Sequence, residues 1–306
     1  MTEAENPAAA GSEPPGVRIG AYVLAGDPVW LASSLSRYYG FLDDLVVVAP
    51  EDRLGWTGRP IPVDECLEVI SRVDQRGIAR IVWGSWRDLI DPLRADTAQR
   101  QAGIDALGDG VDWVLQVDND ELLPEPEQLL ALLGEAERRS LRAVEWPMRV
   151  LFRGRSDGSF LQVVGSDGAP RYDYPGPVAV RAGTRVLQAR RAEGPWLRAV
   201  VRGDIVSRPL LNELAEGEVR LECLEPGQAI VHNSWGRDRR AVYRKVTTWG
   251  HASGWRGPLY YWGTWLPATL TWRVLRDFHP FARGLWPRLG RVQAPDCLLS
   301  EDRQGS

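Results

Sequence analysis

Lysine is almost absent from this 306-residue sequence: Lys245 is the only one, and arginine supplies the rest of the strongly basic residues. We interpret this as a compositional bias, so no arginine stands out by its type alone. Cysteine is scarce too, and Cys66, Cys223 and Cys297 lie far apart in the chain. They provide neither a disulfide framework nor the paired spacing of a zinc site, which suits a reducing cytoplasm.

Long apolar runs are also missing. No uncharged stretch supplies the roughly 18 apolar residues of a membrane-spanning helix, and the longest, residues 257–272, is interrupted by Gly263 and Pro267. Residues 1–16 are polar and rich in Pro, Ala, Glu and Gly, which excludes a signal peptide and predicts a disordered tail. The formal net charge of -4 gives no reason to expect nucleic acid as a partner. We therefore expect a soluble cytoplasmic protein.

The first half of the chain alternates between strand and helix periodicity. Short apolar runs predict strands, and segments with helical apolar spacing lie between them. The expected strands are residues 18–24, 45–48, 78–83, 113–117 and 143–152, and the expected helices are residues 28–39, 63–76, 97–107 and 126–139. This alternation predicts an α/β fold with a mostly parallel sheet.

The second half has a different composition. Residues 153–227 are rich in Gly, Pro and Arg, which favours short strands and loops. From residue 235 the chain becomes aromatic and basic: 7 of the 14 tryptophans lie within residues 235–286, and residues 235–292 hold 11 basic and 2 acidic residues. We divide the chain into a tail (1–16), an α/β half (17–152), a half of short strands and loops that completes the domain (153–234) and a Trp/Arg-rich helical cap (235–306).

An acidic cluster follows the expected strand 113–117. Asp118 and Asp120 are two residues apart at the carboxyl end of a buried strand, where open α/β sheets bind ligands. In an extended segment both carboxylates face the same way, and Mg²⁺ or Mn²⁺ prefers such oxygens together with phosphate. The alternative is a simple turn, because Asp and Asn favour turns and helix caps. Glu121 would cap or orient the turn, and we do not count it as a ligand.

Residues 113–121 resemble the motif Trp-Val-Leu-x-x-Asp-x-Asp-Glu of small family 2 glycosyltransferases. The likeness continues upstream in the strand at residues 21–24 with the following residues 27–31, and in residues 96–101. It spans roughly residues 17–150, half of the chain, and its specificity lies in the order and spacing of the pieces. The family implies the GT-A fold, a Rossmann-like mostly parallel sheet with helices on both faces. It also implies a nucleotide-sugar donor and Mn²⁺ or Mg²⁺ held by the Asp-x-Asp pair. Residues 17–152 would then be the nucleotide-sugar-binding half, and residues 153–234 the acceptor-side half that completes the GT-A domain.

The resemblance further indicates where the donor binds. The base and ribose would lie over the first two strand ends, and a histidine late in the chain would complete the metal site. The matching donor-site positions are Leu24 to Asp27, Glu51, Asp52, Asp96 and Arg100, and the candidate metal ligand is His232. Arg244 and Lys245, on an expected helix at residues 238–249, would reach the diphosphate. The structural alternatives are a turn residue for Asp52, a hydrogen-bonding histidine for His232, and solvated helix charges for Arg100, Arg244 and Lys245.

Inverting transfer, the usual outcome in this family, needs a carboxylate that takes the acceptor's proton. Glu145 and Asp173 are the candidates, although neither lies in a motif. The Gln-x-x-Arg-Trp signature of processive relatives is absent, so we expect transfer of a single sugar. Tryptophan faces stack on sugar rings, so the Trp-rich segment would suit a glycan, lipid-linked or small-molecule acceptor. It would also suit peripheral contact with the inner face of a membrane. Core packing is nevertheless the leading explanation for most of these tryptophans.

Three other functions compete with glycosyl transfer. A sugar nucleotidylyltransferase would need a Gly-rich, Arg-containing loop after its first strand, and residues 25–28 form no such loop. A haloacid-dehalogenase-type phosphatase would need a threonine that the segment after Asp118 lacks. A non-catalytic carbohydrate- or lipid-binding protein would have a broken metal site, whereas the Asp-x-Asp pair is intact.

Overall fold

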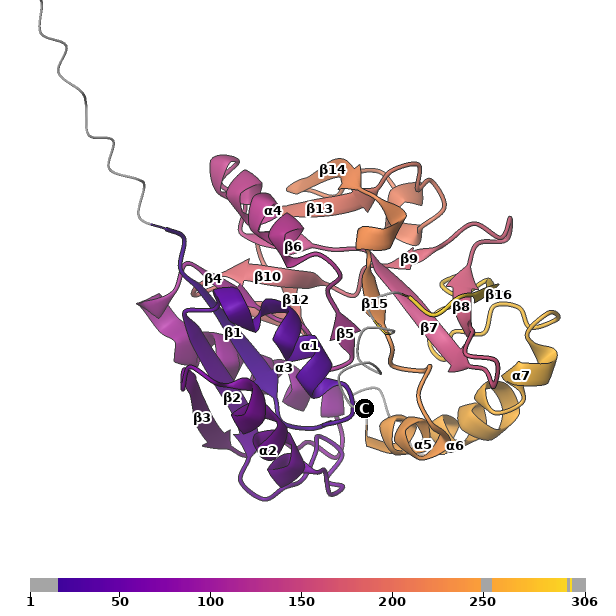
Figure 1. Cartoon of the computed structure of the whole chain (residues 1–306), viewed down its shortest axis with the longest axis horizontal. Coiled ribbons are helices and arrows are strands. Elements are labelled where there is room, and N and C mark those ends of the chain that lie inside the picture. The colour runs from indigo at the N-terminus through magenta and orange to yellow at the C-terminus, as the bar shows by residue number, and fades with distance from the viewer. Residues whose placement is uncertain (1–15, 249–254, 296–297, 299–306) are drawn as a thin grey trace, which may run out of the picture.

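The computed structural model describes residues 16–248, 255–295 and 298 (Figure 1). Its largest element is an eight-stranded sheet with the order β14-β13-β6-β10-β4-β1-β2-β3. Every pairing in this sheet is parallel except those of β10, which runs antiparallel to β4 and β6. The strands are β1 (Ile19–Leu24), β2 (Asp44–Pro50), β3 (Ala79–Gly84), β4 (Trp113–Leu115), β6 (Ala143–Glu145), β10 (Pro177–Arg181), β13 (Trp196–Val201) and β14 (Glu218–Leu224).

Helices cover both faces of this sheet. One face packs under α1 (Leu31–Tyr38), α2 (Val63–Val73) and α4 (Pro126–Arg138) in a single apolar core. The other face packs under α3 (Pro92–Leu107) through Ile104 and Leu107. Gly103 permits the close approach of α3 to β1, because a Cβ there would lie 2.6 Å from the ring of Tyr22. The predicted α/β class, with a mostly parallel sheet between helices, is confirmed.

One predicted strand is wrong in its extent. The apolar run at residues 143–152 forms two strands in different sheets, β6 and β7 (Met148–Gly154). Pro147 has no N–H to donate to a ladder, so it suits the break between them. The boundary of α3 also differs, because the helix begins at Pro92, where the side chain of Asp91 accepts the N–H of Arg94. Apolar periodicity alone does not reveal this polar first turn.

A second, six-stranded sheet stands beside the first. Its path is β16-β8-β7-β15-β5, with β9 also paired to β7. It consists of β5 (Glu121–Leu122), β7, β8 (Phe160–Val164), β9 (Tyr172–Asp173), β15 (Ile230–His232) and β16 (Arg288–Val292). A small hairpin of β11 (Val186–Gln188) and β12 (Arg191–Ala192) stands apart from both sheets.

The C-terminal segment forms a second apolar core on β7 and β8. Its helices are α5 (Arg239–Thr248), α6 (Arg256–Tyr260), a π-helical turn (Tyr261–Trp265) and α7 (Ala268–Thr271). Trp235, Trp265 and Trp286 are buried in this core. The segment expected as a helical cap thus contains helices, and it also contributes the strand β16, which pairs with β8. No helix within the described ranges is long and apolar enough to cross a bilayer, and the expected tail lies outside those ranges apart from Gly16.

Candidate functional site

Two cavities meet at the turn that follows β4. The smaller, of about 190 Å³, lies over the ends of β1 and β2. The larger, of about 910 Å³, lies between the main sheet, the second sheet and the C-terminal segment. Their shared wall consists of Asp96, Arg100, Asp118, Asp120 and Lys245. Ligands in the two cavities would therefore approach each other at the Asp-x-Asp turn.

A buried ion pair holds this turn. Glu121 is fully buried, and both of its carboxylate oxygens accept hydrogen bonds of 2.7 Å from the guanidinium of Arg190. The same carboxylate accepts the backbone N–H of Asp118 at 3.1 Å. Arg190 lies between β11 and β12 and also donates to the carbonyl of Gln116. Glu121 thus fixes the conformation of the turn through its contacts with Arg190 and the Asp118 N–H, while Asp118 and Asp120 line both cavities.

Asn119 joins the turn to the first strand. Its side-chain amide donates to the carbonyl of Leu24 at 3.0 Å and to that of Asp27 at 2.9 Å. The loop after β1 and the loop after β4 are thereby fixed to each other. These two hydrogen bonds give Asn119, the residue between the two aspartates, a structural role.

Helix α3 presents polar side chains to the strand ends at helical spacing. Asp96, Gln99 and Arg100 are all buried, as expected for residues three and four apart on one helix face. Arg100 donates to both oxygens of Asp118, at 2.8 and 3.2 Å, and to Asp96 at 2.7 Å. Burial alone would raise the pKa of Asp118, but Arg100 and Arg190 lower it below the usual value. Asp118 is therefore an ionised group with a fixed position.

Asp120 is surrounded by donors from the segment after β15. Its Oδ2 accepts from Ser234 at 2.7 Å, from Arg237 at 2.8 Å and from Lys245 at 3.0 Å. Burial would raise the pKa of Asp120, yet Lys245 and Arg237 hold it well below its usual range. Arg237 also pairs with Asp27, and Arg244 lies 3.6 Å from the same carboxylate. The cationic wall of the site thus comes from α5 and the residues just before it.

Oδ1 of Asp120 and the ring of His232 are the closest pair of candidate metal ligands. Both oxygens of Asp118 are bound to Arg100, whereas Oδ1 of Asp120 lies 3.8 Å from Nε2 of His232, a nitrogen that is also 2.5 Å from the Oγ of Ser234. Burial lowers the pKa of His232 despite the neighbouring Asp120, and a neutral imidazole can ligate a metal. Within the described ranges, no cluster of three or more acidic, His or Cys side chains is poised for a metal. The protein groups therefore suit an ion that takes its other ligands from phosphate and water, as Mg²⁺ and Mn²⁺ commonly do.

Most of the residues expected to bind the donor do line the smaller cavity. They are Leu24, Asp27, Asp96, Arg100, Arg244 and Lys245. Glu51 and Asp52 are not among its lining residues: both are exposed, and Asp52 accepts the N–H of Leu54 and pairs with Arg87 at 3.4 Å. The loop after β2 contributes Trp56 instead, whose indole N–H donates to Gln99 at 2.6 Å.

The larger cavity contains both candidate bases in different settings. Glu145 pairs with Arg198 at 2.5 Å, and Arg198 also binds Glu218. Burial raises the pKa of Glu145, although Arg198 opposes the shift. This arginine–glutamate network gives Glu145 a structural role at the end of β6.

Asp173 has a different environment. Oδ2 accepts the indole N–H of Trp286 at 2.8 Å, while buried Oδ1 has no hydrogen-bond partner among the described residues. Burial raises the pKa of Asp173 to about 6, against the opposing effects of Trp286 and Arg171. Met148 of β7 pairs with Asp173 on one side and Ile230 on the other. Asp173 and His232, two residues beyond Ile230, therefore point to the same face of the second sheet.

Sequence reasoning missed four residues of this site: Trp56, Arg190, Arg237 and Trp286. The two arginines are nearly fully buried, but in an arginine-rich sequence nothing marks them. Arg237 had one usable signal, its position shortly after the strand that ends at His232. Trp286 contacts Asp173 across 113 residues, a pairing that no local pattern reports.

Comparison with known proteins gives little further guidance. No protein-family model matches the sequence, and no curated protein matches it. Among solved structures, the chain is similar to 4-diphosphocytidyl-2C-methyl-D-erythritol synthase from Anaerococcus prevotii, with 17% identity and a TM-score of 0.33 over 54% of this chain and 70% of that one. It is also similar to CMP:2-keto-3-deoxy-manno-octonic acid synthetase in complex with CTP, with 10% identity and a TM-score of 0.30 over 55% and 75%. At such low TM-scores the likeness supports neither family membership nor activity, and the fold class rests on the strand order itself.

Proposed function

We propose that this protein is a glycosyltransferase that moves a single sugar from a nucleoside-diphosphate sugar to an acceptor in the larger cavity. The observation that carries the proposal is the pair of cavities that share a wall of ionised carboxylates and cations. A transfer reaction needs two substrates held side by side in fixed orientation. The shared wall is where a bond between a diphosphate and a sugar would lie.

The smaller cavity suits the nucleotide part of the donor. Trp56 offers an aromatic face for a base, and Asp118 offers an ionised carboxylate for a hydroxyl group. Lys245 and Arg244 line the same cavity and would donate hydrogen bonds to the diphosphate. Stabilising the charge that develops on the leaving diphosphate is the main electrostatic task in such a reaction.

Asp120 and His232 would hold the divalent cation, with Mn²⁺ or Mg²⁺ as the candidates. When bound, the ion would add Lewis-acid stabilisation of the diphosphate. The chain's own cations, Lys245 and Arg237, keep Asp120 ionised and in place. This arrangement differs from the expectation that Asp118 and Asp120 grip the ion together.

Asp173 is the better candidate for the base that takes the acceptor's proton. It has one buried oxygen without a partner, and a pKa of about 6 leaves it ionised at neutral pH. A carboxyl group with a raised pKa accepts a proton more readily than an ordinary aspartate. Glu145 is held by Arg198 and suits a structural role.

A sugar nucleotidylyltransferase is the second candidate, because a nucleotide site next to a sugar site would serve it too. Such an enzyme must bind a triphosphate, and the loop after β1 at residues 25–30 carries no basic side chain. The cations of this site come instead from α3, the β11–β12 hairpin and α5. Because the cations lie around Asp120 and not in the loop after β1, the site suits a diphosphate beside Asp120 better than a triphosphate on that loop.

Calorimetry with nucleotides tests the proposal. Uridine, guanosine, thymidine and cytidine diphosphates are titrated with and without Mn²⁺ into the wild type, Asp120→Asn and the exposed control Glu127→Gln. We expect one diphosphate to bind only with Mn²⁺, to the wild type and the control but not to Asp120→Asn. The matching nucleotide sugar should then be hydrolysed slowly.

Two outcomes would overturn the proposal. If CTP or another triphosphate binds and releases pyrophosphate when a sugar phosphate is added, the protein is a nucleotidylyltransferase. If no nucleotide binds under any condition, the smaller cavity is not a donor site.

A further inference from the structure

A stripe of apolar side chains lies exposed on the C-terminal helices. The helical segment from Trp255 to Val274 buries Tyr261, Trp265 and Ala268 in the second core. Its outward side exposes apolar residues in two groups: the first three follow at spacings of four and three residues, and the last two are four residues apart. These residues, called the apolar stripe below, are Trp255 (71% exposed), Leu259 (59%), Trp262 (61%), Leu270 (86%) and Val274 (75%).

The surroundings of the apolar stripe are basic. Residues 239–276 contain no acidic residue, while the basic ones are Arg239, Arg240, Arg244, Lys245, Arg256, Arg273 and Arg276. A contiguous apolar surface of this kind normally marks an interaction site. This local excess of positive charge, flanked by Asp238 and the exposed Asp277, favours a neutral or anionic partner.

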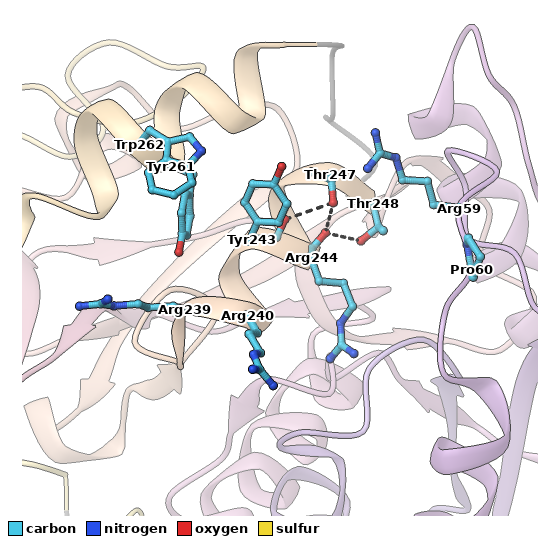
Figure 2. A pocket seen from close by; sticks show the side chains of 10 residues that line it. All are labelled: Arg59, Pro60, Arg239, Arg240, Tyr243, Arg244, Thr247, Thr248, Tyr261 and Trp262. Carbon is cyan, nitrogen blue, oxygen red and sulfur yellow. Dashed lines mark hydrogen bonds between the residues drawn. The ribbon is translucent and has the colours of Figure 1, made fainter.

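Beside the stripe lies an open cavity of about 670 Å³, called the arginine cavity below (Figure 2). Its walls carry Arg59 from the loop before α2, Arg239, Arg240 and Arg244 from α5, and Trp262 from the stripe. Within the part of the chain that the structure describes, Arg59, Arg239 and Arg240 form no salt bridge. Figure 2 shows Arg240 and Arg244 extending from the same side of α5.

We propose that the apolar stripe and the arginine cavity together bind the surface of an anionic lipid bilayer. The stripe would insert its tryptophans and aliphatic side chains at the level of the headgroups, where tryptophan is favoured. The arginines of the cavity would contact lipid phosphates, and Trp262 belongs both to the stripe and to the wall of the cavity. Exposed Trp and Leu side chains beside basic ones are the combination by which peripheral segments lie in a membrane interface.

The bilayer surface would also be close to the candidate donor site. The arginine cavity shares Arg244 and Thr248 with the smaller cavity. A protein bound in this way would hold its reaction site beside lipid headgroups. Membrane binding itself does not depend on the proposed glycosyl transfer, because the stripe and Arg239 and Arg240 lie outside the shared wall.

Vesicle co-sedimentation of the full chain tests the proposal, with phosphatidylcholine vesicles that either contain or lack phosphatidylglycerol. One double variant, Leu259→Ser with Leu270→Ser, removes exposed apolar side chains, and another, Arg239→Gln with Arg240→Gln, removes charge. Ile205→Ser is the matched control, because Ile205 is 77% exposed after β13. We expect binding to anionic vesicles only, weakened about tenfold or more by each double variant and unchanged in the control. Added salt should weaken the wild type.

Three results would overturn the proposal. Equal binding to both vesicle types would show that the arginines do not contact lipid phosphates. Failure to bind either vesicle type would show that the protein does not bind membranes. The third result would come from sedimentation velocity. If the wild type is a dimer that binds no vesicles, and the double variant Leu259→Ser with Leu270→Ser is a monomer, the stripe is an interface between two copies of this chain. Nucleotide calorimetry on the same variants separates this result from the donor site, since both double variants should bind nucleotide like the wild type.

Discussion

Replacing Arg190 by methionine should be among the most damaging single changes in this protein. The Arg190 side chain is 3% exposed and that of Glu121 is 1% exposed, and they share two hydrogen bonds of 2.7 Å. Methionine keeps much of the side-chain length but leaves Glu121 as a buried carboxylate without its cation. Burying an unpaired charge is far more costly than losing a pair that water screens.

The loss of stability should be about 3–5 kcal/mol, the usual range for breaking a buried ion pair from one side. Such a loss is a large share of the 5–15 kcal/mol that typically stabilises a native protein. Replacing Arg190 and Glu121 together by methionine should cost less than Arg190→Met alone, because the stranded charge is then absent. The Asp118 N–H would still lose its acceptor, so part of the cost should remain.

Urea unfolding followed by tryptophan fluorescence measures these differences. Arg202→Met is the matched control, since Arg202 pairs with Glu225 and the two side chains are 63% and 58% exposed. An exposed pair contributes only about 0–1 kcal/mol. The reasoning is refuted if Arg190→Met costs no more than Arg202→Met, or if the double variant is the least stable of the set.

Three further outcomes follow from the site. Asp173 must be ionised to act as the base, so the transfer rate should drop about tenfold as the pH is lowered from 7 to 5, with an apparent pKa of about 6. Asp173→Asn should be slower by about 100-fold or more and should lack this pH dependence. A pH profile of Asp173→Asn like that of the wild type would contradict the assignment. Lys245→Arg should weaken nucleotide binding although it keeps the positive charge. The Nζ of Lys245 contacts Asp120 at 3.0 Å and Ser234 at 2.5 Å, and a planar guanidinium does not fit where a compact ammonium does. Equal nucleotide affinities of the two proteins in calorimetry would contradict this prediction. Trp56→Ala should weaken binding of the nucleoside alone by about tenfold, in line with aromatic stacking on a base, while Trp83→Ala, a change at a half-exposed tryptophan of β3, should have no effect.

Periodicity predicted the centre of the main sheet because β1, β2 and β4 are buried on both faces. Runs such as residues 45–48 are apolar throughout, and only a sheet covered by helices on both sides requires that. The break inside residues 143–152 was missed because residues on both sides of it are equally buried, although in different sheets. An apolar run reports burial, and it does not report which sheet buries it.

The carboxylates of the candidate site were accessible to sequence reasoning, while their partners were not. Asp118 and Asp120 follow a strand at a spacing that carries chemical meaning on its own. Arg190 and Arg237 reach them from 72 and 117 residues further along the chain, counted from Asp118 and Asp120. Their importance comes from burial beside a carboxylate, which is a property of the fold. In a sequence whose basic residues are nearly all arginine, only the structure separates these two from the rest.

The charge balance of the site constrains how it can bind a diphosphate. Five carboxylates and five cations form two neighbouring ion-pair networks, which meet at the Asp-x-Asp turn. One joins Asp96, Asp118 and Glu121 to Arg100 and Arg190, and the other joins Asp27 and Asp120 to Arg237, Arg244 and Lys245. Their formal charges cancel, and burial keeps His232 toward its neutral form. A diphosphate alone would add uncompensated negative charge to this buried wall, and a divalent cation alone would add positive charge beside Lys245. Each therefore compensates the other, so nucleotide and metal should bind with strong positive coupling that is equal in both directions.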